Sequence, residues 1–186
     1  MRQSFTSGHV DGERRFHVPV TVRWRDLDAY GHVNNSSMLT LLEEARIGAF
    51  WKPQPDDDVQ RPMGIVDAGF GGDTLTLIAG HAIDYRAPIP HYPDPLDVQL
   101  WVSHLGGASA EVSYEVWSPL EHGPRILHTV ARSSIVFVDA ETQRPRRLTD
   151  VERAAWQPYV GPQVELRIDR VAAQAQKNTA EGTGQD

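Results

Sequence analysis

The stretch that decides the fold is VRWRDLDAYGHVNNSSMLTLLEEAR, residues 22–46, in which three kinds of local sequence follow one another. An alternating segment ends near Trp24, a polar turn follows, and an apolar segment begins near Ser36. The first turn of a helix presents unpaired backbone N–H groups and the positive end of the helix dipole. A carboxylate in the preceding turn, such as Asp28, would therefore face groups that can hold a developing oxyanion.

The segment after the turn predicts a long helix that is buried on most sides. Its apolar residues follow the i, i+3, i+4, i+7 spacing of a helix and widen into a broad face. They are Met38, Leu39, Leu41, Leu42, Ala45, Ile47, Ala49 and Phe50. We expect the helix to run from about residue 36 to 51, with Asn34, Asn35 or Ser36 as the N-cap and Pro53 as the stop. A sheet that wraps around this helix would cover its apolar surface.

Segments of alternating apolar and polar residues predict an antiparallel sheet. Residues 16–24 alternate strictly, which is typical of a half-buried strand, and Pro19 favours an edge position because it cannot donate to a ladder. Gly106-Gly107 indicates a hairpin. A strand, a helix and then a run of strands is the order of an α+β domain. The further strands are predicted at residues 64–70, 75–86, 96–105, 108–117 and 126–138.

The ends of the chain differ from this central part. Thr149 and Glu152 form a capping box, which predicts a short helix at residues 150–157. From Gln174 onward the chain is polar, and we expect it to be disordered. The sequence therefore predicts a flexible N-terminal arm at residues 1–14, one domain at residues 15–160 and a polar C-terminal tail at residues 161–186.

The composition is that of a globular protein with one domain. The chain has 186 residues, which is enough for a good core. Its formal net charge of −7 argues against a general nucleic-acid surface. Because the chain has no Cys, disulfides, thiolate metal sites and a Cys nucleophile are excluded. The N-terminus has no apolar h-region and no stretch approaches about 18 apolar residues, so we expect neither secretion nor a membrane span. A cytoplasmic location is the expectation.

The turn and the helix start carry a motif. The order Asp-x-Asp-x-x-Gly-His-Val-Asn-Asn runs from Asp26 to Asn35, and Glu-Glu-Ala-Arg follows at residues 43–46. This composite resembles the 4-hydroxybenzoyl-CoA thioesterase family, the acyl-CoA thioesterase branch of the hotdog fold. The resemblance implies a curved antiparallel sheet wrapped around one long central helix, which agrees with the order of elements over residues 16–140. It also implies hydrolysis of an acyl thioester to the free acid and CoA, without a cofactor or a metal.

The resemblance assigns roles to residues of the turn. Asp28 would be the catalytic carboxylate, either a nucleophile that forms an acyl-enzyme anhydride or a general base for water. The backbone N–H of Asn35 would be the oxyanion donor. Gly31, His32 and Asn34 would support the site through a positive φ, through the positioning of substrate or water, and through the helix cap. The alternative is that Asp28 only braces the turn.

Other polar groups near the motif have structural interpretations. Asp26 is expected to hold the loop or to pair with Arg23 or Arg25. The eight His residues show no metal-binding spacing, so we expect neither a metal site nor a catalytic dyad of His32 with Asp28.

The predicted helix carries its own carboxylates, Glu43 and Glu44. A different thioesterase branch of the same fold places its catalytic carboxylate on the central helix. These two residues lie about two turns into the helix, and we favour a salt bridge with Arg46 or Lys52.

The expected partners follow from the resemblance. The thioester would be carried by CoA or by an acyl carrier protein, and family members are dimers or tetramers, so at least a homodimer is expected. No nucleic acid or membrane partner is expected.

A non-catalytic acyl-CoA-binding protein, serving as a sensor or partner subunit, is the alternative function. A dehydratase would need a different His–carboxylate arrangement. The candidate cations for the CoA phosphates are Arg23, Arg46, Arg86 and Arg132.

Overall fold

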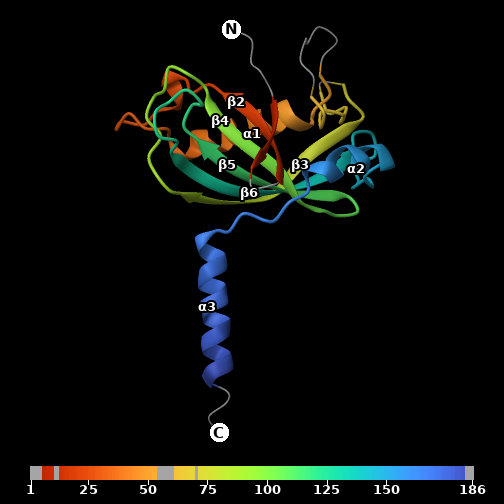
Figure 1. The fold of residues 1–186 in the computed structure, drawn as a ribbon. Helices are drawn as coiled ribbons and strands as arrows, with labels where there is room; N and C mark the ends of the chain where they lie inside the picture. Colours follow the sequence, from red (N-terminus) through yellow and green to blue (C-terminus); the bar gives the residue numbers. More distant parts are fainter. Residues whose placement is uncertain (1–5, 11–12, 54–60, 70, 183–186) are drawn as a thin grey trace.

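The computed structural model describes residues 6–10, 13–53, 61–69 and 71–182, and its centre is a six-stranded antiparallel sheet (Figure 1). The order in the sheet is β1-β2-β4-β5-β6-β3, so β3 forms one edge. This arrangement confirms the α+β class. The strands are β1 Thr6–Val10, β2 Glu13–Val20, β3 Thr74–Tyr85, β4 Leu96–Leu105, β5 Ser109–Trp117 and β6 Leu127–Asp139. The helices are α1 Asn35–Phe50, α2 Asp150–Trp156 and α3 Arg167–Gly182, with the 3-10 turns η1 Trp24–Asp26 and η2 Gln157–Tyr159.

The helix α1 packs its apolar side against one face of the sheet (Figure 1). Burying a Leu side chain contributes roughly 1.5–3 kcal/mol, so this side anchors the helix. At the start of α1 the Tyr85 hydroxyl donates to the Asn35 carbonyl at 3.3 Å, and beyond its end the Trp51 indole N–H donates to Thr76 Oγ1 at 3.3 Å. The helix therefore runs antiparallel to β3. Its most buried residues are Met38, Leu41, Leu42, Ala45 and Ala49, each at most 1% exposed.

Two segments differ from the sequence-based prediction. Residues 6–10, predicted as part of a flexible arm, form β1 and pair with β2. The Asp-Gly dipeptide at residues 11–12 is a hairpin signal that favours this pairing. The described part of the strand predicted at residues 64–70 is not a strand: Val66 makes only an isolated bridge to Trp51, and Phe70 lies outside the described residues. Glycines in that segment weaken a strand, which accounts for the difference.

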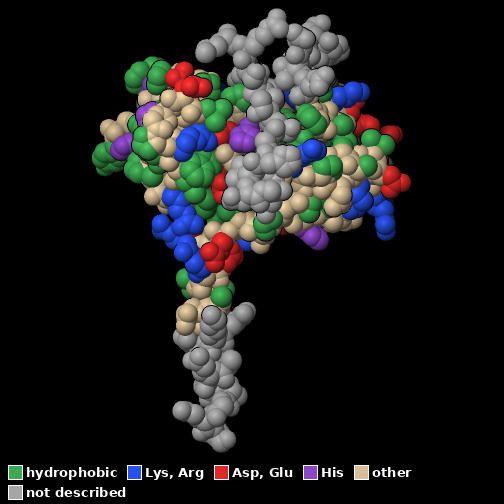
Figure 2. Space-filling view, in the orientation of Figure 1, with side chains coloured by type: hydrophobic (Ala, Val, Ile, Leu, Met, Phe, Trp, Pro, Cys, Tyr) green, Lys and Arg blue, Asp and Glu red, His purple; other side chains and the backbone are tan. Residues whose placement is uncertain are grey.

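The C-terminal segment differs as well. The chain stays packed on the sheet beyond the predicted domain end, because Trp101 Nε1 donates to the Pro162 carbonyl at 2.7 Å and Leu166 is 1% exposed. It then forms α3, which extends away from the body (Figures 1 and 2), although the sequence predicts disorder from Gln174. Residues 167–181 contain no Gly or Pro and several Ala, which favours a helix. Within the described ranges, no helix is long and apolar enough to cross a membrane.

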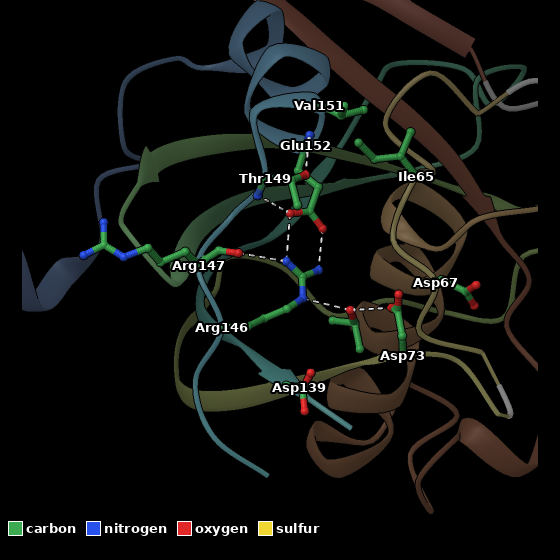
Figure 3. Close-up of a pocket in the computed structure, with 10 residues that line it drawn as sticks. Ile65, Asp67, Asp73, Asp139, Arg146, Arg147, Thr149, Val151 and Glu152 are labelled. Carbon is green, nitrogen blue, oxygen red and sulfur yellow. Dashed lines mark hydrogen bonds and ion pairs between the residues drawn. The ribbon is translucent and has the colours of Figure 1, made fainter. Parts of the chain in front are cut away.

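The helix α2 is fastened to the sheet by an ion pair (Figure 3). Arg146 donates twice to the Glu152 carboxylate and once to Thr74 Oγ1, the last at 2.9 Å. The predicted capping box is confirmed, since Thr149 Oγ1 accepts from the Glu152 N–H at 3.2 Å and the Glu152 carboxylate accepts from the Thr149 N–H at 2.7 Å. These groups line a cavity of about 300 Å³ at the Thr74 end of β3. Tyr85 is at the other end, roughly 35 Å away along an extended strand, so this cavity is remote from the start of α1.

Glu152→Gln is expected to lower the free energy of unfolding by about 1–3 kcal/mol at pH 7, because it removes charge-assisted hydrogen bonds. Burial acts to raise the pKa of Glu152, but the hydrogen bonds from Arg146 and Thr149 outweigh it and hold the pKa below its usual value. A depressed carboxylate pKa stabilises the fold above the unfolded pKa of about 4.3, and this contribution is lost as the pH falls through the folded pKa. Urea unfolding should therefore show a gap between variant and wild type that narrows below about pH 4.

The exposed Glu141 provides the matched control for this experiment. Glu141→Gln should match wild-type stability at every pH. A Glu152→Gln protein that is as stable as the wild type at pH 7 would contradict the role given to the ion pair.

Candidate active site

The carboxylate of Asp28 uses one of its oxygens to hold the turn before α1. Its Oδ1 accepts from the N–H of Tyr30 at 2.8 Å and from the N–H of His32 at 3.1 Å. The backbone closes the same turn, because the Asp28 N–H donates to the His32 carbonyl at 2.7 Å and the Gly31 N–H donates to the Asp28 carbonyl at 3.1 Å. Its Oδ2 has no hydrogen-bond partner among the described residues. One oxygen of this side chain therefore braces the turn, and the other has no hydrogen bond to a described residue.

Gly31→Ala is expected to destabilise the protein by about 1–2 kcal/mol, the cost of a left-handed conformation for a residue with a Cβ. Gly31 has a φ of +76°, and a Cβ placed there would meet no atom within 4 Å, so the cost is conformational. Thermal or urea unfolding measures it. Gly107→Ala is the matched control, because its Cβ also meets nothing within 4 Å and its φ lies outside the left-handed region. Equal stability of the two variants would remove the case for strain at residue 31.

The other carboxylate of the motif, Asp26, is bound by Arg23, one of its two predicted partners. Its two oxygens accept from the guanidinium of Arg23 at 2.9 and 3.2 Å and from the Arg23 N–H at 2.8 Å. Burial acts to raise the pKa of Asp26, but these hydrogen bonds hold it below its usual value. Asp26 is 4% exposed. Its side chain braces η1 by binding Arg23 at the N-cap, in agreement with the structural role expected for it.

The helix start leaves one backbone donor open. Asn34 is the N-cap: its Oδ1 accepts from the Ser36 N–H at 2.9 Å, and its own N–H donates to the Asp26 carbonyl at 2.8 Å. The helix begins at Asn35, one residue before the predicted Ser36. No described residue accepts a hydrogen bond from the Asn35 N–H. Such a group is the kind of donor that can bind an oxyanion.

A cavity of about 290 Å³ brings the main candidates together. Asp28, His32 and Asn35 all line it. Gly31 and Asn34 do not, and they act on the site through the shape of the turn and through the helix cap. The structure thus places Asp28, which carries a carboxylate, and Asn35, which has an open backbone N–H, among the residues that line one cavity.

Two residues of this cavity, Tyr85 and Thr129, were not predicted from the sequence as site residues. Tyr85 ends β3 and binds the Asn35 carbonyl through its hydroxyl; burial raises the pKa of that hydroxyl. Thr129 lies on β6, is fully buried and has no hydrogen-bond partner for its Oγ1 among the described residues. Both lie far along the chain in strands, and no local pattern marks them.

His32 contributes through its backbone. Its N–H and its carbonyl both pair with Asp28, and its ring, half-buried in the cavity wall, makes no hydrogen bond to a described residue. Across the described side chains, no cluster of three or more His, Asp or Glu could hold a metal ion.

The helix carboxylates lie outside this cavity. Glu44 pairs with Arg23 at 3.1 Å, so the predicted pairing with Arg46 or Lys52 is wrong for this residue. The guanidinium of Arg23 reaches both Glu44 and Asp26, and a contact between a turn and the side of a helix cannot be inferred from helical spacing. Glu43 lines a different cavity of about 80 Å³ between α1 and β3.

Arg46 lies in that second cavity without a counter-charge. It is 8% exposed, its Nη1 has no hydrogen-bond partner, and no described carboxylate lies within ion-pairing distance. Burial and the charge of Arg46 lower the pKa of His81 on β3, and Glu43 acts in the opposite direction, so the three groups are neighbours. A buried, uncompensated charge is costly.

The arginines considered for CoA phosphates differ in how close they lie to the Asp28 cavity. All of Arg23, Arg86 and Arg132 form ion pairs, but only Arg86 lines the Asp28 cavity. Arg167, at the base of α3, donates to the Tyr85 carbonyl at 3.5 Å and so lies beside the same end of β3. Figure 2 shows basic side chains gathered where α3 leaves the body.

Solved structures resemble this chain. PA2801, a candidate thioesterase from Pseudomonas aeruginosa, is 30% identical over 76% of this chain and 95% of that chain, with a TM-score of 0.59. A thioesterase from Thermus thermophilus, complexed with coenzyme A and Zn, is 26% identical over 80% of this chain and 96% of that chain, with a TM-score of 0.57. YbaW, a candidate thioesterase from Escherichia coli, is 25% identical over 78% of this chain and 98% of that chain, with a TM-score of 0.57. No curated protein sequence matches the chain significantly.

A family model also matches most of the chain. The match covers residues 22–161, which include the Asp28 turn, the helix α1 and the four strands from β3 to β6. The residues that line the Asp28 cavity all fall within it. Because more than half of the sequence is matched, the chain belongs to the thioesterase-like superfamily.

Proposed function

We propose that the protein is an acyl-CoA thioesterase, which hydrolyses an acyl thioester to the free acid and CoA. The observation that carries the proposal is that Asp28, which has one uncommitted carboxylate oxygen, and Asn35, which has an open backbone N–H, line the same cavity. Membership of the thioesterase-like superfamily supports the reaction class. We also assign the hotdog fold, with the sheet curved around α1, and the Asp-dependent branch represented by the 4-hydroxybenzoyl-CoA thioesterases.

In the proposed mechanism the thioester carbonyl oxygen accepts from the Asn35 N–H and its carbon faces Asp28. Asp28 either attacks that carbon, giving an anhydride that water then hydrolyses, or takes a proton from a water that attacks. In both routes the C–S bond breaks with its electron pair on sulfur, and the thiolate is protonated afterwards. A preorganised oxyanion donor of this kind is worth about 3 kcal/mol in the barrier.

The carrier is proposed to be CoA. A Thermus thermophilus thioesterase similar to this chain is complexed with coenzyme A, which supports this choice over an acyl carrier protein. Arg86 at the cavity and Arg167 at the base of α3 are suited to contact CoA phosphates, since guanidinium groups bind phosphate oxygens in a bidentate manner. The Asp84 Oδ2 atom lies 3.3 Å from Arg86 Nη2, so the Asp84 carboxylate offsets part of the positive charge of Arg86.

A homodimer is the proposed minimum assembly. The strand β3 is a sheet edge, and His81, beside Arg46 and Glu43, lies near its middle. When two identical strands pair antiparallel about a two-fold axis, the middle of each meets its copy. Glu43 of one protomer would then lie close to Arg46 of the other. The second copy would thereby supply the counter-charge that Arg46 lacks, and a tetramer would be built from such dimers.

A thiol-release assay over short, long and aromatic acyl-CoAs, with one acyl carrier protein thioester, tests the function. Turnover of any of them supports a thioesterase. Tight binding without turnover supports the non-catalytic acyl-CoA-binding protein, which the use of Asp28 Oδ1 in the turn favours. A protein that neither binds nor hydrolyses these thioesters overturns both. The cytoplasmic location stays a prediction.

A further inference from the structure

Thr129, one of the residues that line the Asp28 cavity, carries a hydroxyl without a hydrogen-bond partner among the described residues. Thr129 is 0% exposed, and its Oγ1 has no hydrogen-bond partner in the described part of the chain. A buried hydroxyl without a partner costs stability, and native proteins leave few such groups without a functional reason. The same residue lines the cavity with Asp28 and Asn35. A ligand in that cavity is therefore the available partner for the hydroxyl.

The position of Thr129 on β6 explains why it reaches the site. It pairs with Tyr85 across the β3–β6 ladder, and the Tyr85 hydroxyl binds the Asn35 carbonyl at the start of α1. Ser133, four residues along and on the same face of the strand, is also buried, but its hydroxyl is bound to His81 at 2.8 Å. Of these two hydroxyls on one face of β6, that of Ser133 has a hydrogen-bond partner and that of Thr129 has none among the described residues.

We propose that Thr129 and Asp28 together hold the water that attacks the thioester. This inference rests on the proposed function and selects its general-base route. A buried water is held by two to four polar partners, and Asp28 Oδ2 alone supplies one. With the Thr129 hydroxyl as the second, the water oxygen is directed at the carbonyl carbon polarised by the Asn35 N–H. One water proton passes to Asp28, the C–O bond forms, the C–S bond breaks, and the thiolate leaves; Thr129 keeps its own proton.

Thr129→Val tests the proposal, because valine has nearly the same shape and lacks the hydroxyl. We expect kcat to fall about 10- to 100-fold with KM within about twofold, since a misplaced reactant costs rate rather than binding. The melting temperature should equal or exceed that of the wild type, because the change removes an unsatisfied buried group. Thr129→Ser, which keeps the hydroxyl, should recover most of the wild-type kcat. If Thr129 were merely structural, Thr129→Val would have a lower melting temperature than the wild type, and Thr129→Ser would not restore kcat.

Thr76→Val is the matched control, since Thr76 lies on the same face of the sheet near the other end of β3, where its hydroxyl binds Trp51. Its kcat should stay at the wild-type level. If the wild type hydrolyses acyl-CoA and Thr129→Val does so equally fast, the inference about Thr129 is overturned and the thioesterase function stands. If the wild type hydrolyses none of the panel, both are overturned.

Discussion

Asp28→Asn is expected to lower kcat for acyl-CoA hydrolysis by about 10²- to 10⁴-fold while leaving the fold intact, the range associated with losing a general base. The amide oxygen of the new side chain can still accept from the N–H groups of Tyr30 and His32, so the turn keeps its hydrogen bonds. The amide nitrogen that replaces Oδ2 can neither take a proton from water nor attack a carbonyl carbon. Activity and stability are therefore separated by one substitution.

The measurement pairs steady-state kinetics with acyl-CoA binding and thermal unfolding. Binding and melting temperature should stay near wild-type values, because the cavity walls and the turn are preserved. Asp26→Asn is the matched comparison two residues away. It weakens the ion pair with Arg23, so it should lower the melting temperature and reduce kcat much less. If Asp28→Asn retains wild-type turnover, residue 28 serves only the turn and the proposed mechanism fails.

The local part of the site could be predicted from the sequence because it depends on residues close along the chain. The hydrogen bonds of Asp28 reach only to residues 30 and 32, and the cap at Asn34 reaches only to Ser36. Turns and caps of this kind are fixed by a few residues with specific backbone and side-chain preferences. The positive φ of Gly31 belongs to the same class.

The rest of the site could not be predicted because it depends on strand register. Thr129 is 101 positions after Asp28 and reaches the cavity only through the β3–β6 pairing with Tyr85. A shift of one residue in that register would turn Thr129 to the other face of the sheet. The long strand itself was predicted from its apolar residues, but these residues do not indicate which position of the strand lies opposite the start of α1.

The fold shows the same division. The helix and the long strands follow strong periodic signals, whereas β1 and α3 follow weaker ones in polar segments. The Asp-Gly at residues 11–12 and the Ala-rich run at 167–181 were sufficient local signals for structure. The prediction gave more weight to polar composition, which indicates that little of a segment will be buried. A polar segment can still form regular structure when its backbone hydrogen-bonds to a neighbouring strand or within a helix.

Glu43→Gln is expected to weaken self-association by at least about 10⁴-fold if Glu43 of one protomer pairs with Arg46 of the other, because the two-fold axis makes two such pairs and the substitution removes both. Removing one partner of a buried ion pair costs about 3–5 kcal/mol, and each 1.4 kcal/mol is a factor of ten. Glu43 is exposed in the single chain and Arg46 has no carboxylate within ion-pairing distance there, so the same substitution should leave an isolated protomer unaffected. Sedimentation across a concentration series measures the dissociation constant.

Two further variants test whether the ion pair crosses between subunits. Glu44→Gln changes the neighbouring carboxylate, which pairs with Arg23 in its own chain, and should leave the dissociation constant unchanged. The double variant Glu43→Arg with Arg46→Glu reverses both charges and should restore association, since each carboxylate again meets a guanidinium across the two-fold axis. If Glu43→Gln associates as tightly as the wild type, Glu43 of the partner is not the counter-charge of Arg46, and the Arg46 guanidinium stays uncompensated. A more stable Arg46→Met protein would then follow, because replacing an uncompensated buried cation by an apolar side chain of similar length removes its desolvation cost.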